Sequence, residues 1–194
     1  MLDDKETAWL AKFVRYEEPP FNNKHVKELR KFLNIDNLSE VLGKLPSDLA
    51  SMVEQSIACH PLLKAVGYWR SRAELELPDP SSLVSQRVIP GRENIESYLR
   101  SGAVYAQWRG ISWCRFRCGL TGLGMGSRCL TDGEWVWPEG LAHYIGKHSV
   151  TLPDAMIESM RRRGWKVPVV PRHVKYDVLG KPNQRFWISW AKGT

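Results

Sequence analysis

The segment from Ser112 to Pro153 reads SWCRFRCGLTGLGMGSRCLTDGEWVWPEGLAHYIGKHSVTLP, and most of the signals that decide the fold lie in it. It holds three of the four cysteines, two of the five histidines and three of the nine tryptophans. The segments 128–131 and 134–137, in which successive side chains would lie on alternate faces of a strand, flank Asp132-Gly133. This dipeptide is preferred in two-residue hairpin turns. These residues predict a β-hairpin, and Pro138 is expected to open a helix directly after it.

Working outward, alternation over 103–108 and 111–117 predicts another hairpin, and 185–190 (RFWISW) is expected to form a closing strand. The glycine-rich residues 119–127 match no phosphate-binding motif and indicate a loop. Helices are expected over 93–101 and from Pro153 onward, because their apolar residues recur at helical spacing. The core aromatics are expected to be Trp108, Trp113, Trp135, Trp137 and Trp190.

The first sixty residues differ in character from the rest of the chain. Apolar residues at helical spacing, together with Asn, Ser and Pro signals at helix ends, predict helices near 3–16, 22–33 and 47–59, with a short helix opening at Asn37. The expected fold is therefore α+β. A helical lobe (1–67) and an extended connector (68–92) precede an α+β domain (93–194), which has a small, mostly antiparallel sheet of four or five strands and two packed helices.

Composition restricts the compartment and the partners. The chain has 194 residues and a net charge of +7, and no apolar run approaches the ~20 residues of a membrane span. No secretory signal is apparent at the N-terminus, so a cytosolic protein with reduced cysteines and no membrane partner is expected. Nothing in the sequence indicates an oligomeric state.

The positive charge is concentrated at the C-terminal end. Residues 161–194 hold nine Lys or Arg against one acid, Asp177, which gives this tail a local charge of +8. Such a patch attracts an acidic protein surface or a nucleic acid, and it also suits a solvated face without a partner. The binding candidates are Arg161, Arg162, Arg163, Trp165 and Lys166.

A nucleic-acid interface is one alternative for the same tail. If 111–117 is a strand, Trp113, Arg115 and Arg117 share one face, where they could stack bases and contact phosphates. A solvated arginine face over Cys114 and Phe116 explains the same pattern.

Zinc binding is a further candidate. Cys114, Cys118 and Cys129, with His143 or His148, supply enough thiolate and imidazole ligands for a four-coordinate site. However, residues four apart in a regular strand lie about 13 Å apart, too far to share an ion. We therefore expect buried, unmodified cysteines and no cofactor, unless a turn separates the pair.

Acid–base chemistry is the third candidate. Glu139 and His143 lie four residues apart on the expected helix, and Asp132 precedes them in the turn. No nucleophile motif accompanies them, so a structural role for this pair is the expected reading and an enzyme the less favoured one.

The segments SWCRF (112–116), LTDGEWVWPEGLAHY (130–144) and HSVTLP (148–153), preceded by YLRSG (98–102), resemble a block of uncharacterised bacterial proteins. That block has the pattern S-x-C-R-F-C-G followed by D-G-x-W-x-W-P-E-G-L-x-H-Y. This chain differs from it by Arg117 between Phe116 and Cys118. The resemblance implies a bacterial or phage origin and brings no activity with it.

Together these observations favour a non-catalytic protein of the immunity or anti-defence type, which binds and inhibits or regulates a macromolecular partner through a basic surface.

Overall fold

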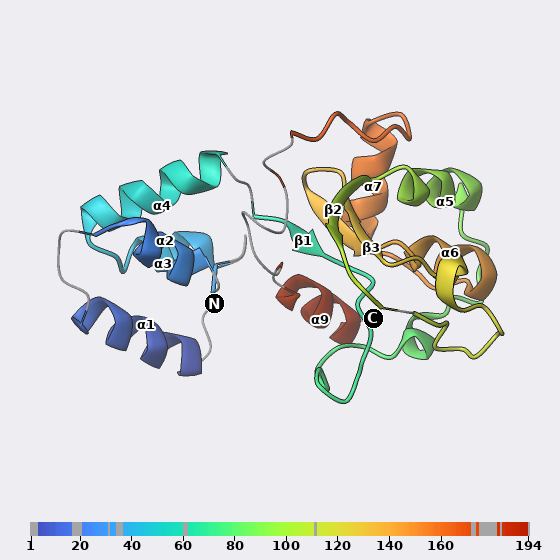
Figure 1. The fold of residues 1–194 in the computed structure, drawn as a ribbon, viewed down its shortest axis with the longest axis horizontal. Coiled ribbons are helices and arrows are strands. Elements are labelled where there is room, and N and C mark those ends of the chain that lie inside the picture. Colours follow the sequence, from blue (N-terminus) through green and yellow to red (C-terminus); the bar gives the residue numbers. More distant parts are fainter. Residues whose placement is uncertain are drawn as a thin grey trace. The chain divides into compact units, whose positions relative to one another are not determined.

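The computed structural model describes residues 4–16, 21–30, 32–33, 37–59, 62–110, 112–171, 174, 182 and 184–193. The chain divides into two compact units, residues 1–63 and 64–194. The first unit is helical and the second is α+β, as the sequence predicts (Figure 1). The predicted connector, 68–92, belongs to the second unit.

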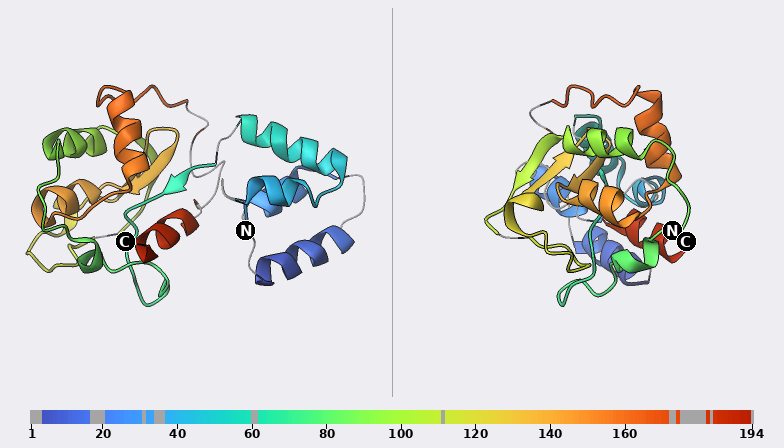
Figure 2. Two further views of the ribbon diagram at one scale, coloured as in Figure 1. Left: turned by 180° about the vertical axis from the view of Figure 1, so that it is seen from behind. Right: turned by 90° about the vertical axis from the view of Figure 1, so that its right-hand side faces the viewer.

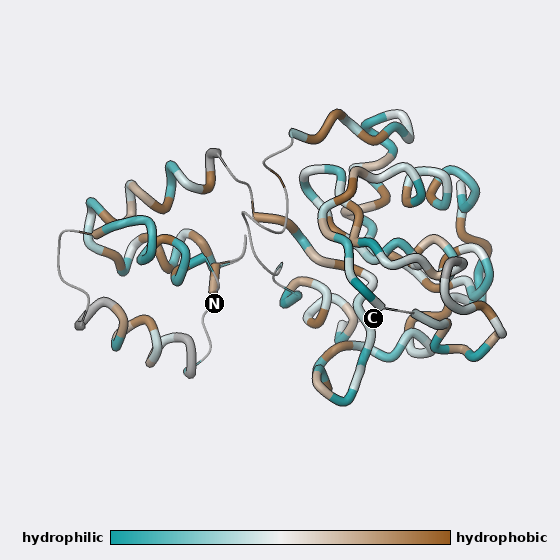
Figure 3. The backbone as a smooth tube through the Cα atoms, viewed as in Figure 1, coloured by the Kyte–Doolittle hydropathy of each residue, from teal (hydrophilic) through white to brown (hydrophobic). Residues whose placement is uncertain are grey.

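The first unit contains four helices close to the predicted positions: α1 (Asp4–Tyr16), α2 (Asn23–Arg30), α3 (Leu38–Leu42) and α4 (Ser47–Cys59). Its buried apolar residues form a core of their own, with Leu29, Leu49 and Val53 almost fully enclosed. Hydrophilic and hydrophobic residues alternate along the helices of both units (Figure 3), as expected for helices with one buried face.

The second unit is built on a four-stranded sheet with the order β1-β4-β3-β2. The strands are β1 (Lys64–Ala65), β2 (Ala103–Gln107), β3 (Arg128–Thr131) and β4 (Trp135–Pro138). β2, β3 and β4 pair antiparallel, and β1 adds to β4 in the parallel direction. The predicted hairpin around Asp132-Gly133 is confirmed by the β3–β4 pair, in which Asp132 Oδ1 accepts hydrogen bonds from the backbone amides of Glu134 and Trp135.

Four helices lie in the described part of the second unit beside this sheet: α5 (Arg92–Arg100), α6 (Leu141–His148), α7 (Asp154–Arg162) and α9 (Arg185–Lys192). α5 packs against α6 and α7, and α9 packs against β1, near which it lies in the left view of Figure 2. Short 3-10 turns, η1 (Pro80–Leu83) and η2 (Gly122–Gly124), lie in the connecting loops. None of the described helices is both long and apolar enough to cross a membrane.

Three expected elements are wrong. Residues 185–190 form α9 instead of a closing strand, because Phe186, Trp187 and Trp190 also suit a helical face. Residues 112–117 are not a strand: β2 pairs with β3, and only an isolated bridge joins Trp113 to Thr121. Pro138 closes β4, and the helix after it begins three residues later, at Leu141.

The core aromatics are also partly different from those expected. Trp135 and Trp137 are fully buried, and so is Trp187, whose indole N–H donates to the backbone oxygen of Tyr68. Trp108 and Trp113, expected in the core, are instead 49% and 59% exposed. This correction matters for function, because exposed tryptophans need an explanation that core packing does not supply.

Candidate metal centre

The residues around Cys114 form a tight turn in place of the expected strand. The backbone N–H of Arg117 donates to the carbonyl of Cys114 at 3.0 Å, and the N–H of Cys114 donates to the carbonyl of Leu120 at 3.1 Å. Arg117 and Gly119 both have left-handed backbone angles, with φ of 53° and 90°. The chain thus reverses between Cys114 and Cys118 and brings the two side chains to the same place.

Helix α6 supplies two imidazoles to that place. The Sγ of Cys114 lies 3.2 Å from Nε2 of His148, and the Sγ of Cys118 lies 3.4 Å from Nε2 of His143. The two Nε2 atoms are 3.2 Å apart. All four ligand atoms lie within 4.8 Å of one another. Four of the five candidate ligands named from the sequence therefore converge. The strand geometry that argued against a shared ion does not apply.

The surroundings hold this cluster in shape. The ring of Phe116 stacks on the ring of His148, with centroids 4.2 Å apart. The hydroxyl of Tyr144 accepts a hydrogen bond from the backbone N–H of Arg115, which ties α6 to the turn. Cys114 is buried, the two histidines are partly buried and Cys118 is exposed.

The electrostatics of the cluster favour neutral imidazoles. Burial lowers the pKa of His143, and the positive charges of His148, Arg100 and Lys147 lower it further. Burial also lowers the pKa of His148, with a smaller effect from Lys147. Burial raises the pKa of the Cys114 thiol. The neutral imidazole is the form that ligates a metal, whereas the thiols must lose their protons to do so.

Cys129, the remaining cysteine candidate, lies outside the cluster. It is buried in β3, and its sulfur accepts a hydrogen bond from the hydroxyl of Tyr68 at 3.3 Å. The structure thus divides the three cysteines of the second unit into two ligand candidates and one core residue.

The acid–base candidates are not brought together. Glu139 forms an ion pair with Arg128 and accepts from the backbone amides of Ser127 and Arg128, so its carboxylate is held away from chemistry with His143. The Arg128 guanidinium is the main cause that lowers the pKa of Glu139. Asp132 is buried with Tyr98 and Arg163.

The basic candidates of the tail fall into two groups. Arg163 is half-buried: it pairs with Asp132 and Glu134 and donates to the hydroxyl of Tyr98. Arg161 pairs with Glu158. Arg162 and Lys166 are exposed, while Trp165 is half-buried against the core. The residues 172–173, 175–181 and 183 lie outside the described part of the chain.

The candidates next to the metal cluster are all accessible. Trp113, Arg115 and Arg117 are exposed around the turn, while Cys114 and Phe116 between them face inward. Sequence reasoning identified these three residues but did not identify their neighbours Tyr68, Trp69 and Tyr144, which line a pocket with Trp113. No local signal marks those aromatics, because the fold alone brings them together.

The chain was compared with protein-family models, with curated proteins and with solved structures, and none of them matches. The resemblance to the bacterial sequence block stays a prediction.

Proposed function

We propose that this chain is a non-catalytic, zinc-binding protein that engages a macromolecular partner. One zinc ion would be held by Cys114, Cys118, His143 and His148. The observation that carries the proposal is the convergence of two thiols and two imidazoles, from a turn and a helix far apart in sequence, within 4.8 Å.

The distances suit a tetrahedral zinc site. With Zn–S near 2.3 Å and Zn–N near 2.0 Å, tetrahedral geometry separates two nitrogens by about 3.3 Å and a sulfur from a nitrogen by about 3.5 Å. The corresponding contacts are 3.2 Å between the two imidazoles and 3.2 and 3.4 Å between sulfur and nitrogen. Thiolate and imidazole are also the ligands that zinc prefers.

Four protein ligands indicate a structural ion. They fill the coordination of zinc, whereas catalytic zinc keeps one position open for water or substrate. Such an ion would fasten the turn that follows Cys114 to α6, so that Trp113, Arg115 and Arg117 are held in fixed positions on the surface. We infer that this zinc-fastened surface, rather than the tail, is the principal contact with the partner, since Arg163 pairs with the buried Asp132 and Arg161 pairs with Glu158 on the same helix.

Metal content of purified protein tests the proposal, with matched cysteine variants. We expect about one zinc per wild-type chain, determined by native mass spectrometry together with elemental analysis. Cys118→Ser and His143→Ala should lose the ion. Cys129→Ser should keep it, because Cys129 is a thiol of the same unit that lies outside the cluster.

Cys118 is the informative position because it is exposed, so its replacement by serine removes a ligand without opening a cavity. Circular dichroism of each variant separates loss of the ion from loss of the fold. A wild-type protein that stays metal-free after incubation with zinc, or a Cys129→Ser variant that loses zinc as readily as Cys118→Ser, would contradict the proposal.

A further inference from the structure

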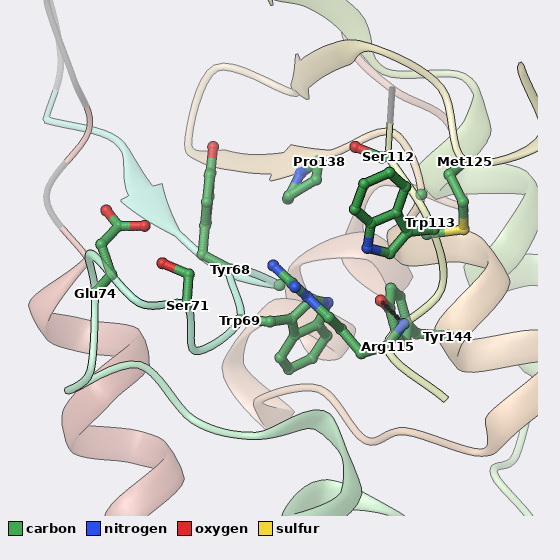
Figure 4. A pocket seen from close by; sticks show the side chains of 12 residues that line it. Tyr68, Trp69, Ser71, Glu74, Ser112, Trp113, Arg115, Met125, Pro138 and Tyr144 are labelled. Atoms are coloured by element: carbon green, nitrogen blue, oxygen red, sulfur yellow. Dashed lines mark hydrogen bonds between the residues drawn. The ribbon is translucent and has the colours of Figure 1, made fainter. Parts of the chain in front are cut away.

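A pocket of about 310 Å³ lies beside the turn that carries the two cysteines. Figure 4 shows Trp113 at one side of it, Tyr68 at the other and the guanidinium of Arg115 between them, with Trp69 below. Ser112, Met125, Pro138 and Tyr144 complete this part of the wall. The lining therefore combines four aromatic side chains with the guanidinium of Arg115.

Trp113 is an exposed part of this wall. Its 59% exposure leaves a large flat apolar surface in contact with water. An indole face is a stacking platform for any planar ring, and stacking on a nucleobase tolerates all base types, since every base has a π face. The pocket thus offers a planar ligand a surface that the fold itself does not use.

Arg115 supplies charge at the same place. Within the part of the chain that the structure describes, its guanidinium has no hydrogen bond or ion pair, although its charge contributes to the field at Asp79. An arginine without a partner beside an aromatic pocket suits a ligand that carries both a ring and an anion. It also disfavours a cationic ligand, which an aromatic cage would otherwise attract.

The sequence around Arg115 is positively charged as well. No aspartate or glutamate occurs between Glu96 and Asp132, a stretch that contains five arginines. Glu74 is the acidic residue of the pocket lining, and in Figure 4 it lies on the side of Tyr68 away from Trp113. A carboxylate there could accept hydrogen bonds from the amino edge of a base and would repel a phosphate toward Arg115.

A second pocket of about 280 Å³ neighbours the first, because Tyr68 and Glu74 line both. Its wall includes Trp108, the other exposed tryptophan of the chain's described part, together with Tyr105. Each exposed tryptophan therefore lines one of two neighbouring pockets. Two neighbouring pockets of this kind match successive nucleotides of one strand, whereas a single small ligand does not require both.

We propose that these two pockets bind consecutive nucleotides of a single-stranded nucleic acid. One base stacks on Trp113, Arg115 contacts its phosphate, and the neighbouring base lies against Trp108. The inference rests on the proposed function, because the zinc site is what would fix Trp113 and Arg115. Duplex DNA or RNA is a poor ligand, since its bases are already stacked on one another.

Fluorescence anisotropy with labelled oligonucleotides of about 12 nucleotides tests this inference. The probes are single-stranded DNA and RNA of one mixed sequence and the duplex of the same length. The two single-stranded probes distinguish a DNA ligand from an RNA ligand. The proteins are the wild type, Trp113→Ala, Arg115→Ala and Arg87→Ala. Arg87 is an exposed arginine outside both pockets, so its removal changes the net charge by the same amount as removal of Arg115.

We expect single strands to bind more tightly than the duplex and Trp113→Ala to weaken this binding about 10-fold or more. Arg115→Ala should lower the slope of log affinity against log salt by about 0.7, as expected for one lost phosphate contact on a single strand. Arg87→Ala should leave the affinity within about 2-fold of the wild type, as expected for a distant surface charge.

The zinc content of every protein is measured in the same samples. Wild-type protein that carries zinc and does not bind a single strand would overturn this inference and leave the proposed function intact. Equal losses in Arg115→Ala and Arg87→Ala would also overturn it, because they would indicate general charge attraction. Wild-type protein without zinc would contradict the proposed function instead.

Discussion

Replacing Arg163 by methionine should destabilise the second unit strongly, although this residue lies within a basic cluster that resembles a binding surface. Its guanidinium pairs with the carboxylates of Asp132 and Glu134 and donates to the hydroxyl of Tyr98. The side chain of Asp132 is 0% exposed, whereas that of Arg163 is 27% exposed. Methionine keeps most of the length of the side chain and removes the charge, so the carboxylate of Asp132 stays buried without its cation.

Breaking a buried ion pair from one side costs about 3–5 kcal/mol in stability. The lower end applies here, because Asp132 keeps three hydrogen bonds, one from Tyr98 and two from backbone amides. A loss of about 3 kcal/mol corresponds to a fall of roughly 10 °C in melting temperature for a unit of this size.

Chemical denaturation and thermal melts of Arg163→Met and of Arg162→Met measure the effect. Arg162 is the neighbouring exposed arginine and should change stability by less than about 0.5 kcal/mol. A double-mutant cycle with Asp132→Asn should show that the two substitutions are strongly non-additive. The reasoning is refuted if Arg163→Met and Arg162→Met are equally stable.

Removing zinc with a strong chelator should lower the melting temperature by about 10 °C or more, because a ligand at about 1,000 times its Kd stabilises the fold by about 4 kcal/mol. Added zinc should restore it, and Cys118→Ser should not respond to the chelator. The difference in stability between the wild type and Glu139→Gln should be largest at neutral pH. Folding lowers the pKa of Glu139, so its charged carboxylate stabilises the folded state at pH values above the unfolded pKa. That difference should vanish as the pH falls through the folded pKa, and a difference that persists in acid would argue against the Arg128 pair. Gly126→Ala should cost about 1–3 kcal/mol, because Gly126 has φ of 70° and a Cβ there would overlap the Glu139 carboxylate, whereas Gly110→Ala has open space and should be near neutral in urea denaturation.

Most elements of the fold could be predicted from local pattern. Helical periodicity identified α1, α2, α4, α5 and α7, and the Asp132-Gly133 turn identified the β3–β4 hairpin. The two-residue strand β1 was missed, because it is too short for a pattern and pairs with a strand some seventy residues away. Residues 185–190 satisfy both a strand and a helix pattern, so packing against β1 decides between them.

The residues of the candidate metal centre could be predicted from the sequence, but their arrangement in space could not. All four residues were identified by type, but the strand expected over 111–117 separated Cys114 from Cys118. The turn depends on a left-handed φ at Arg117, a conformation rare for residues other than glycine, so the sequence gives no signal for it. The exposure of Trp113 follows from the same turn, which is why a tryptophan expected in the core lines a surface pocket.

The most direct test of the central claim is zinc K-edge X-ray absorption spectroscopy of the purified protein. The account predicts two sulfur ligands at about 2.3 Å and two nitrogen ligands at about 2.0 Å, with no solvent oxygen. Cys118→Ser should lose one sulfur ligand or the metal altogether. Two results would contradict the assignment of Cys114, Cys118, His143 and His148 as the zinc site. One is a wild-type spectrum with oxygen ligands alone, and the other is a Cys129→Ser spectrum with a changed sulfur count.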